Sequence, residues 1–336
     1  MEENLVSKEV ELSLALLSLE RKSQKHLLFD LSTNQTRGIC SAVLSCATCV
    51  FQNSGWLLMI QHKPPHSEEM TIFLVHPSTS KRVNLPVLHS AKEGFFAFYV
   101  GSRGTPLVVA FIENKLTCDL LPTIHTVCPG DIYWSVYEHS GYHSQLKESY
   151  RFLEDIIIVD VALVGREVVC ADYYGKIMVF NITEMTWRMA FAPEWSIADE
   201  HFVVAMKGQV VLVSCRHHPC SHPFRFLKLD MKSLEWLPLD ESELDNSAWF
   251  LQKSFSLYVR QEGKRKVYMF GSDGSTRREV DYREKSPAEK SIMNIFAHDL
   301  VDGTTEKILP ASIVTETCNW VLPGMFDAAA SQWPAH

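Results

Sequence analysis

Two short stretches of the sequence carry side chains that could bind a metal ion. The first, CATC at residues 46–49, has the CxxC spacing found in zinc and redox sites. No second CxxC completes a four-thiolate zinc site, and the pair precedes a predicted strand, whereas a reactive dithiol stands at the start of a helix. The second, CRHHPCSH at residues 215–222, has five Cys and His side chains, but its spacing matches no standard zinc motif. We interpret it as a polar connection between two strands, and we predict neither a metal nor a cofactor.

Three acids, Asp155, Asp160 and Asp172, surround a predicted pair of strands. Propeller enzymes use acids near their central channel, but acids are also common at strand ends because they form turns. The motifs GxxxxGK[ST], GxGxxG, HExxH and GxSxG are absent, and with them the usual signals of phosphate, dinucleotide, metalloprotease and hydrolase sites. We therefore predict no catalytic residue and a protein that is not an enzyme. A propeller enzyme with its active site at the central channel is the alternative.

A short phrase of residues recurs along the chain after runs that favour β-structure. Three copies end on a tryptophan and three weaker ones do not: CPGDIYW (128–134), NITEMTW (181–187), DMKSLEW (230–236), and the stretches that begin at Asp30, His76 and Asp299. The six copies begin 46, 52, 53, 49 and 69 residues apart. A period near fifty residues is typical of a repeat array.

Buried-strand patterns precede most copies of the phrase. Each is a short apolar run opened by a turn residue, and these runs begin at Gly55, Pro106, Gly165 and Gly208. Long amphipathic helical patterns are scarce. Three or four short strands per repeat predict an all-β fold, a kelch-like β-propeller of six, or alternatively seven, four-stranded blades.

The propeller is expected over residues 26–325, between an N-terminal segment (1–25) and a C-terminal tail (326–336). Too few residues precede Asp30 to form a full blade, and the strand candidate TCNWVLP (317–323) could supply the missing partner. An open ring would expose sheet edges. We therefore predict that N- and C-terminal strands close the ring within one blade.

The three tryptophans, Trp134, Trp187 and Trp236, are interpreted as structural. We expect each to enter the outer fourth strand of its blade and to cover the gap to the neighbouring sheet. They should therefore occupy equivalent places in three successive blades.

The polar tract 271–291 explains the longest interval between copies of the phrase. Its charges nearly alternate in sign and it has no apolar stripe to bury, so we predict an exposed loop between the second and third strands of a late blade. Because binding residues concentrate on such loops, it is also the candidate partner-contacting segment. The side chains concerned are Arg277, Arg278, Asp281, Tyr282 and Arg283.

Composition narrows the class of protein. The chain has 336 residues, 46% of them hydrophobic and 21% charged, with a net charge of −8. This charge predicts no nucleic-acid or membrane partner, and no apolar run is long enough to span a bilayer. The N-terminus lacks the basic start of a secretory signal, and nine scattered cysteines indicate reduced thiols. We expect a monomer in the cytoplasm, the nucleus or both.

Four ordered motifs carry a family resemblance: GWLLMI, ADYYGKIMVFN, KLDMKSLEW and SFSLYV. With them, residues 26–325 resemble the plant F-box-associated propeller family, known as domain of unknown function 295, which includes the kink-suppressor proteins. The resemblance implies a propeller that presents substrates to an SCF-type ubiquitin ligase through a Skp-type adaptor. The sequence shows no recognisable F-box, which needs about forty residues with a leading Leu-Pro. A binding protein unconnected with ubiquitin is therefore the alternative.

Overall fold

The computed structural model describes most of the chain between residues 15 and 321. The described stretches are 15–19, 25–31, 35–40, 47–61, 69–89, 94–113, 123–137, 158–173, 175–191, 199–216, 223–252, 256–272, 293–308 and 318–321. Within them no helix is long and hydrophobic enough to cross a lipid bilayer.

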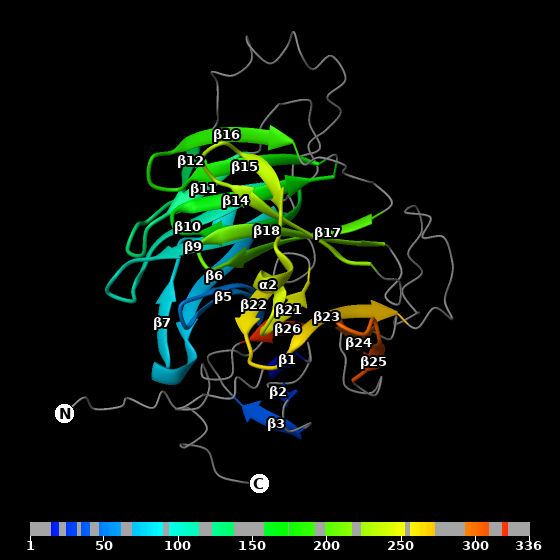
Figure 1. Ribbon diagram of the computed structural model, residues 1–336. Coiled ribbons are helices and arrows are strands. Elements are labelled where there is room, and N and C mark those ends of the chain that lie inside the picture. Colours follow the sequence, from blue (N-terminus) through cyan, green and yellow to red (C-terminus); the bar gives the residue numbers. More distant parts are fainter. Residues whose placement is uncertain are drawn as a thin grey trace, which may run out of the picture.

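The strands form six sheets that follow one another along the chain (Figure 1). The terminal sheet has the order β26 (Cys318–Val321), β1 (Ala15–Leu19), β2 (Lys25–Asp30), β3 (Gln35–Cys40). The next contains β4 (Ala47–Asn53), β5 (Trp56–Gln61), β6 (Glu69–His76) and β7 (Lys81–Asn84), with β8 (Leu88–His89) also paired to β6 and a 3-10 turn, η1 (Pro77–Thr79), between β6 and β7. The third sheet contains, in order, β9 (Gly94–Val100), β10 (Pro106–Glu113), β11 (Ile124–Val127) and β12 (Ser135–Tyr137). The fourth contains, in order, β13 (Ile158–Val164), β14 (Glu167–Asp172), β15 (Lys176–Asn181) and β16 (Thr186–Phe191).

The last two sheets are joined by a short helix, α2 (Glu241–Leu244). The first has the order β17 (Asp199–Met206), β18 (Gln209–Arg216), β19 (Arg225–Asp230), β20 (Glu235–Pro238). The second has the order β22 (Leu257–Arg260), β21 (Ser247–Leu251), β23 (Arg265–Ser272), β24 (Met293–Asp299), β25 (Thr305–Lys307).

The protein is an all-β propeller, as the repeats predicted, but its blade count differs from the prediction. Five sheets follow a four-stranded antiparallel path and form the five blades of four strands. The β21–β25 sheet differs, because it has five strands and its β21 and β23 run parallel. The expectation of six or seven four-stranded blades was therefore wrong. The sixth copy of the phrase belongs to this five-stranded sheet, which is why counting copies gave one blade too many.

The first strands of successive sheets meet near the centre of the molecule. Strand β4 contacts β9, β9 contacts β13, β13 contacts β17, and β17 contacts β22. Each of these inner strands has buried residues, and the remaining residues are mostly half-buried. The remaining strands of each sheet lie progressively further out (Figure 1).

Tight turns join the first and second strands of two sheets. Ser54 and Gly55 have φ values of 48° and 82°, and Lys207 and Gly208 have 47° and 78°. Positive φ at both central residues is the type I′ geometry, whose twist matches that of the flanking strands. Glycine adopts this conformation without the clash of a Cβ atom, so the predicted starts of β5 and β18 are set by local turn chemistry.

The recurring phrase is a five-residue turn between the third and fourth strands. The backbone N–H of Met185 donates to the carbonyl of Asn181 at 2.8 Å, and Leu234 donates to Asp230 at the same distance. Met185 and Leu234 have φ values of 56° and 58°. Gly303 closes an equivalent turn onto Asp299.

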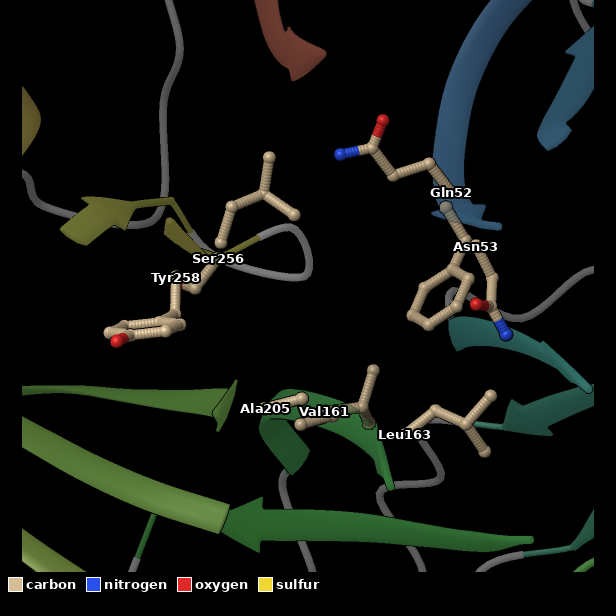
Figure 2. Close-up of a pocket in the computed structure, with 10 residues that line it drawn as sticks. Gln52, Asn53, Val161, Leu163, Ala205, Ser256 and Tyr258 are labelled. Carbon is tan, nitrogen blue, oxygen red and sulfur yellow. The ribbon is translucent and has the colours of Figure 1, made fainter. Parts of the chain in front are cut away.

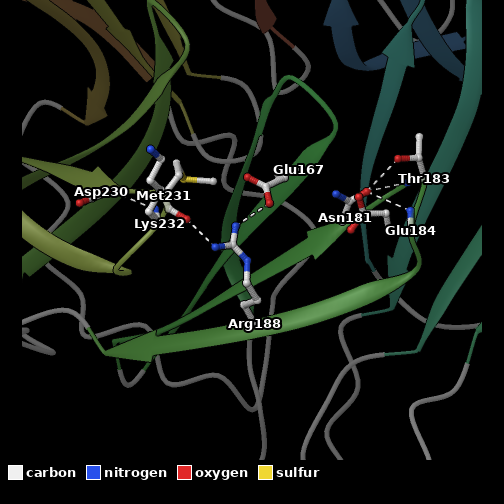
Figure 3. Close-up of polar contacts among 8 residues, drawn as sticks. All are labelled: Glu167, Asn181, Thr183, Glu184, Arg188, Asp230, Met231 and Lys232. Carbon is white, nitrogen blue, oxygen red and sulfur yellow. Dashed lines mark hydrogen bonds and ion pairs between the residues drawn. The ribbon is translucent and has the colours of Figure 1, made fainter.

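Side chains at the first position of these turns hold the backbone. Oδ1 of Asn181 accepts hydrogen bonds from the backbone N–H of Thr183 and Glu184, both at 3.0 Å (Figure 3). Oδ1 of Asp230 accepts from Lys232 at 2.9 Å, and Oδ1 of Asp299 from Val301 at 2.9 Å. The phrase recurs because Asn and Asp form such turns with their own backbone.

The hydrophobic core lies between the faces of neighbouring sheets. At one such interface the ring of Phe180 on β15 lies 5.8 Å from Tyr137 on β12 and 4.9 Å from Trp187 on β16, measured between ring centroids. Each large apolar side chain that is fully buried contributes about 1.5–3 kcal/mol to folding. The sheets are therefore held together chiefly by apolar packing.

Strands from the two ends of the chain share one sheet, as predicted. Strand β26 pairs with β1 in antiparallel register, with Ala15 opposite Val321 and Ser18 opposite Cys318. Strand β1 lies inside the segment 1–25 that we expected to precede the propeller, so the sheet begins earlier than that boundary. The expected tail, 326–336, lies outside the described residues.

Candidate functional site

A cavity of about 160 Å³ lies at the centre of the propeller, between the inner strands (Figure 2). Strands β4, β13, β17 and β22 contribute most of its wall. The lining residues are Phe51, Gln52, Asn53, Val161, Ala162, Leu163, Ala205, Ser256, Leu257 and Tyr258. Four sheets thus converge on one small space.

The polar side chains of this wall differ in whether they form hydrogen bonds within the protein. Asn53 donates from Nδ2 to the carbonyl of Phe98 at 2.9 Å, and the Ser256 hydroxyl donates to the carbonyl of Gln252 at 2.9 Å. The side-chain amide of Gln52 is buried at both Nε2 and Oε1, and neither atom forms a hydrogen bond with the part of the chain that the structure describes. Figure 2 shows this side chain at the edge of the cavity.

Tyr258 also has a buried hydroxyl that forms no hydrogen bond with the described residues. Its ring packs against Trp249 at 5.0 Å between centroids, and Figure 2 shows the hydroxyl pointing away from the cavity.

Charge is missing from the described wall of the cavity. None of its ten lining residues is an acid, a base or a histidine. General acid–base catalysis needs a titratable group within hydrogen-bond reach of the reacting atoms. This wall can bind a neutral molecule, but it offers no pair of groups for proton transfer.

The two described acids that the sequence suggested as candidates accept hydrogen bonds from backbone N–H groups. Asp160 is fully buried on β13, where one carboxylate oxygen accepts from the N–H of Val161 at 2.9 Å and the other from Val203 on β17 at 2.8 Å. It therefore joins two neighbouring sheets. Asp172 is buried as well and accepts from the backbone N–H of Lys176 at 2.7 Å. Asp155 lies outside the described residues.

The side chain of Lys176 is buried beside Asp172. Burial lowers the pKa of this lysine, and the neighbouring carboxylate opposes that shift. Neither residue is among the described residues that line the central cavity.

The cysteine clusters do not form a metal centre in the described part of the chain. Cys49 lies within β4, where burial raises the pKa of its thiol to about 12, so it stays protonated at neutral pH. Cys215 is buried in β18, and none of Cys49, Cys128, Cys170 and Cys215 is part of a disulfide. Cys46 and residues 217–222 lie outside the description. Among the described residues, no group of three or more His, Cys, Asp or Glu side chains is placed to hold a metal ion.

The repeated tryptophans lie at the corners between third and fourth strands. Trp187 stands opposite Phe180 and Trp236 opposite Leu229, each as the second residue of its fourth strand. Trp134 directly precedes β12, is half-buried, and donates from Nε1 to the carbonyl of Pro86 at 2.9 Å. This last bond joins the β9–β12 sheet to the preceding one.

An arginine makes a similar connection one sheet further on (Figure 3). Arg188 on β16 pairs with Glu167 on β14 and also donates to the carbonyl of Met231 in the turn after β19. The outer corners of these sheets are thus tied together by side chain to backbone contacts.

An exposed apolar cluster at the corner between β11 and β12 was missed by sequence reasoning. We call it the β11–β12 corner: Ile132, Tyr133 and Val136 are 80%, 71% and 56% exposed. Asp131 fixes the turn by accepting the backbone N–H of Cys128 at 2.8 Å. The sequence carried one signal for this cluster. This copy of the phrase has Ile-Tyr directly before its tryptophan, where the other two copies that end on a tryptophan have Met-Thr and Leu-Glu.

The predicted partner-contacting side chains (Arg277, Arg278, Asp281, Tyr282 and Arg283) lie outside the described residues. Their segment connects β23 with β24.

The sheets around the central cavity define a β-propeller. The chain belongs to the KIB1-4 beta-propeller family, whose model matches residues 21–289. No curated protein matches the sequence.

Two solved structures match parts of the chain. One, described as the structure of U3-55K, is 8% identical with a TM-score of 0.34, and the match covers 61% of this chain and 55% of that one. The other, apo AztD from Citrobacter koseri, is 10% identical with a TM-score of 0.38, and the match covers 73% of this chain and 72% of that one. The chain thus spans about half the length of U3-55K, and neither likeness bears on function.

Proposed function

We propose that the protein is a non-enzymatic interaction propeller that recognises a protein substrate for an SCF-type ubiquitin ligase. The observation that carries the interaction role is the β11–β12 corner. Its three exposed apolar side chains lie within five residues of sequence. Exposed apolar patches mark sites of protein contact, and aromatic residues are enriched in the centres of such contacts. The ligase role rests on the resemblance to F-box-associated propellers.

Several features support binding over catalysis. The ten described lining residues of the cavity include no titratable pair, and the buried acids Asp160 and Asp172 accept backbone hydrogen bonds. The rest of the proposal is that the protein acts as a monomer without a cofactor, in the cytoplasm, the nucleus or both. The net charge of −8 and the four described cysteines, which form no disulfide, support this setting.

The test is affinity purification of the tagged full chain from plant cells, followed by mass spectrometry. We expect Skp and cullin subunits together with a partner protein. The double variant Ile132→Ser/Tyr133→Ser should lose the partner while its melting temperature is kept, because both side chains are exposed. Val301→Ser, which alters a side chain that is 75% exposed elsewhere, is the matched control and should keep the partner.

Two outcomes would contradict separate parts of the proposal. Reproducible absence of Skp and cullin, with the partner retained, would remove the ligase role and leave a standalone binding protein. Equal recovery of the partner by the double variant and the control would remove the β11–β12 corner as the contact surface.

A further inference from the structure

The turns that join first to second strands carry exposed basic residues in three successive sheets. Arg103 lies between β9 and β10, Arg166 between β13 and β14, and Lys207 between β17 and β18, and all three are exposed. None of them forms an ion pair with the described part of the chain. We call these three turns, residues 101–105, 165–166 and 207–208, the inner turns, and they contain no acid. They therefore concentrate positive charge on a protein whose net charge is −8.

Contacts between sheets place the inner turns around one region. The guanidinium of Arg166 lies 5.8 Å from the ring centroid of Tyr99, which stands near the end of β9, just before the turn that holds Arg103. Nζ of Lys207 lies 5.7 Å from the ring centroid of Tyr258, and Tyr258 lines the central cavity. The basic residues therefore stand at the end of the inner strands where this cavity lies.

The ammonium group of Lys207 is not committed to an acid of the protein itself. Its charge contributes to the lowered pKa of the Glu243 carboxyl, but the hydrogen bond from Lys228 at 2.9 Å is the largest cause of that shift, and the charge of Lys207 is the smallest. Lys207 can therefore pair with a carboxylate from outside.

The cavity is more exposed toward the inner turns than toward its interior. Residues two apart on a strand face the same side. On β13 Val161 is buried and Leu163 half-buried, and on β17 Val203 is buried and Ala205 exposed. Leu163 and Ala205 line the cavity two residues before their turns, and Figure 2 shows both beside the open space. An occupant can therefore enter from the side on which the basic residues stand.

The cavity limits what can enter it. Its volume is about 160 Å³, whereas sites for drug-sized ligands measure roughly 300–1,000 Å³. Val161, Leu163, Ala205 and Leu257 give its wall an apolar surface. One apolar side chain fits this space. A protein segment that inserts such a side chain and carries acids on either side of it would complement both the cavity and the inner turns, since pocket anchors supply affinity and surrounding charges supply orientation.

The charge of the surrounding turns favours a peptide over a nucleic acid. Strands alternate in direction within the four-stranded sheets, so the turns between third and fourth strands lie at the same end as the inner turns. These outer turns are mixed in charge: Asp131 and Glu184 lie in two of them, and Lys81 and Lys232 lie at or in two others. Nucleic acids bind to basic stripes that neutralise many phosphates. A narrow basic region within a mixed rim fits a short acidic segment instead.

We infer that this end of the ring binds an acidic segment of a partner protein. Its carboxylates lie beside Arg103, Arg166 and Lys207, and one apolar side chain of the size of leucine occupies the central cavity. The inference goes beyond the proposed function, because it requires neither the ligase role nor contact at the β11–β12 corner.

The first experiment measures binding of short peptides to the full chain by NMR titration. The probe is the blocked peptide Glu-Asp-Leu-Asp-Glu. One control peptide replaces its acids with glutamine and asparagine, and the other replaces its leucine with glycine. Each control should bind at least about tenfold more weakly, because it lacks either the charges or the apolar anchor. Raising sodium chloride from about 50 to about 500 mM should also weaken binding of the probe, since salt screens exposed charges.

Three results of this titration would overturn the inference. The probe fails to bind, or either control peptide binds as tightly as the probe does. In the third, a short oligothymidylate binds more tightly than the probe, which would assign the surface to a nucleic acid.

The second experiment removes charge from the protein. Arg166→Gln/Lys207→Gln should weaken binding of the probe at least about tenfold. Arg216→Gln/Lys232→Gln is the matched control, because it removes two exposed positive charges from the other end of β18 and from an outer turn, and it should bind within about twofold of wild type. Both variants should keep the melting temperature, since all four residues are exposed. Equal weakening in the two variants would show that only net charge matters and would overturn the inference.

The third experiment fills the cavity. Ala205 is exposed at the cavity wall, so Ala205→Leu should occupy the space without lowering the melting temperature. The variant should bind the leucine probe only as tightly as wild type binds the glycine peptide, and its affinity for the glycine peptide should be unchanged. If the variant still prefers leucine over glycine by the wild-type factor, the cavity does not hold the anchor and the inference is wrong.

Discussion

The neighbouring β17–β20 and β21–β25 sheets differ in how their strands pair. In the first, each strand pairs with the one before it, and every pair is antiparallel. In the second, β21 lies between β22 and β23, antiparallel to one and parallel to the other. Without β21, the order β22, β23, β24, β25 would be that of an ordinary blade. We call β21 the inserted strand, and its parallel pairing with β23 sets this sheet apart from the five blades.

The inserted strand is held at its N-terminal end by the loop that crosses it. Asn246 accepts from the N–H of Gln261 through its carbonyl and from Gly263 through Oδ1, both at 2.8 Å, and Ser247 donates to the carbonyl of Lys264 at 2.8 Å. All five residues of β21 are buried. The comparison indicates that local turns can determine the strand pairing of the β17–β20 sheet. The strand pairing of the five-stranded sheet depends instead on packing around β21.

The largest expected effect comes from removing the central side chain of β21. Trp249 is fully buried, packs against Phe226 and Tyr258, and donates from Nε1 to Oγ of Ser247 at 2.9 Å. Trp249→Ala should lower the free energy of unfolding by about 3–5 kcal/mol, measured by urea denaturation. Trp236→Ala, on the outer strand of the regular sheet, is the control and should cost less. A greater loss in the control would show that β21 is not the centre of stability.

A smaller loss is expected where two regular sheets are joined. Asp160→Asn keeps the size of the side chain but turns one acceptor of a backbone N–H into a donor. Since hydrogen bonds to charged groups contribute about 1.5–3 kcal/mol, we expect a loss in that range in the same urea assay. Asp131→Asn, at an exposed turn, should cost less because solvent can replace the lost bond. Equal losses would mean that Asp160 does not hold β13 to β17.

The loop over β21 provides a third test. Asn246 has a φ of 56°, a left-handed conformation that costs roughly 1–2 kcal/mol for most residues but less for Asn and Gly. Asn246→Ala should therefore destabilise by about 1–2 kcal/mol, and Asn246→Gly by less, because glycine loses only the side-chain bond to Gly263. Thermal unfolding of both variants checks the order. If glycine were the worse of the two, the bond and not the backbone conformation would dominate.

Much of the fold was predictable because its boundaries are local. Asp30, His76, Asn181, Asp230 and Asp299 each end a strand, and β11 ends one residue before Cys128. These positions follow from turns whose side chains bond to nearby backbone, a signal that a single sequence carries. Closure by residues 317–323 was predictable for a different reason, since an unpaired sheet edge is unfavourable.

The inserted strand and the central cavity could not be predicted in the same way. Residues 247–251 are apolar throughout, a pattern that fits a buried strand beside any partner, so pairing with β23 is decided by tertiary contacts. Gln52 looks like an ordinary polar residue on an alternating strand. Its burial depends on a bulge in β4 and on side chains from three other sheets, which no local pattern encodes.

The smallest effect concerns the joint between the two compared sheets. The carboxylate of Glu243 in α2 accepts a hydrogen bond from Nζ of Lys228 on β19 at 2.9 Å and a further one from the backbone N–H of Asp240. These hydrogen bonds, that from Lys228 first, hold the pKa of the carboxyl below its ordinary value of 4.5. A carboxyl with a lowered pKa stabilises the fold fully above its unfolded pKa and loses that contribution as pH falls through its folded pKa. Glu243→Gln should therefore be less stable than wild type at pH 7, and the difference should shrink below about pH 4.5. Urea denaturation from pH 7 to pH 3, with Glu262→Gln as the control at an exposed position, measures this. A difference that stays constant with pH would show that the ion pair does not tie α2, and with it the start of β21, to the regular sheet.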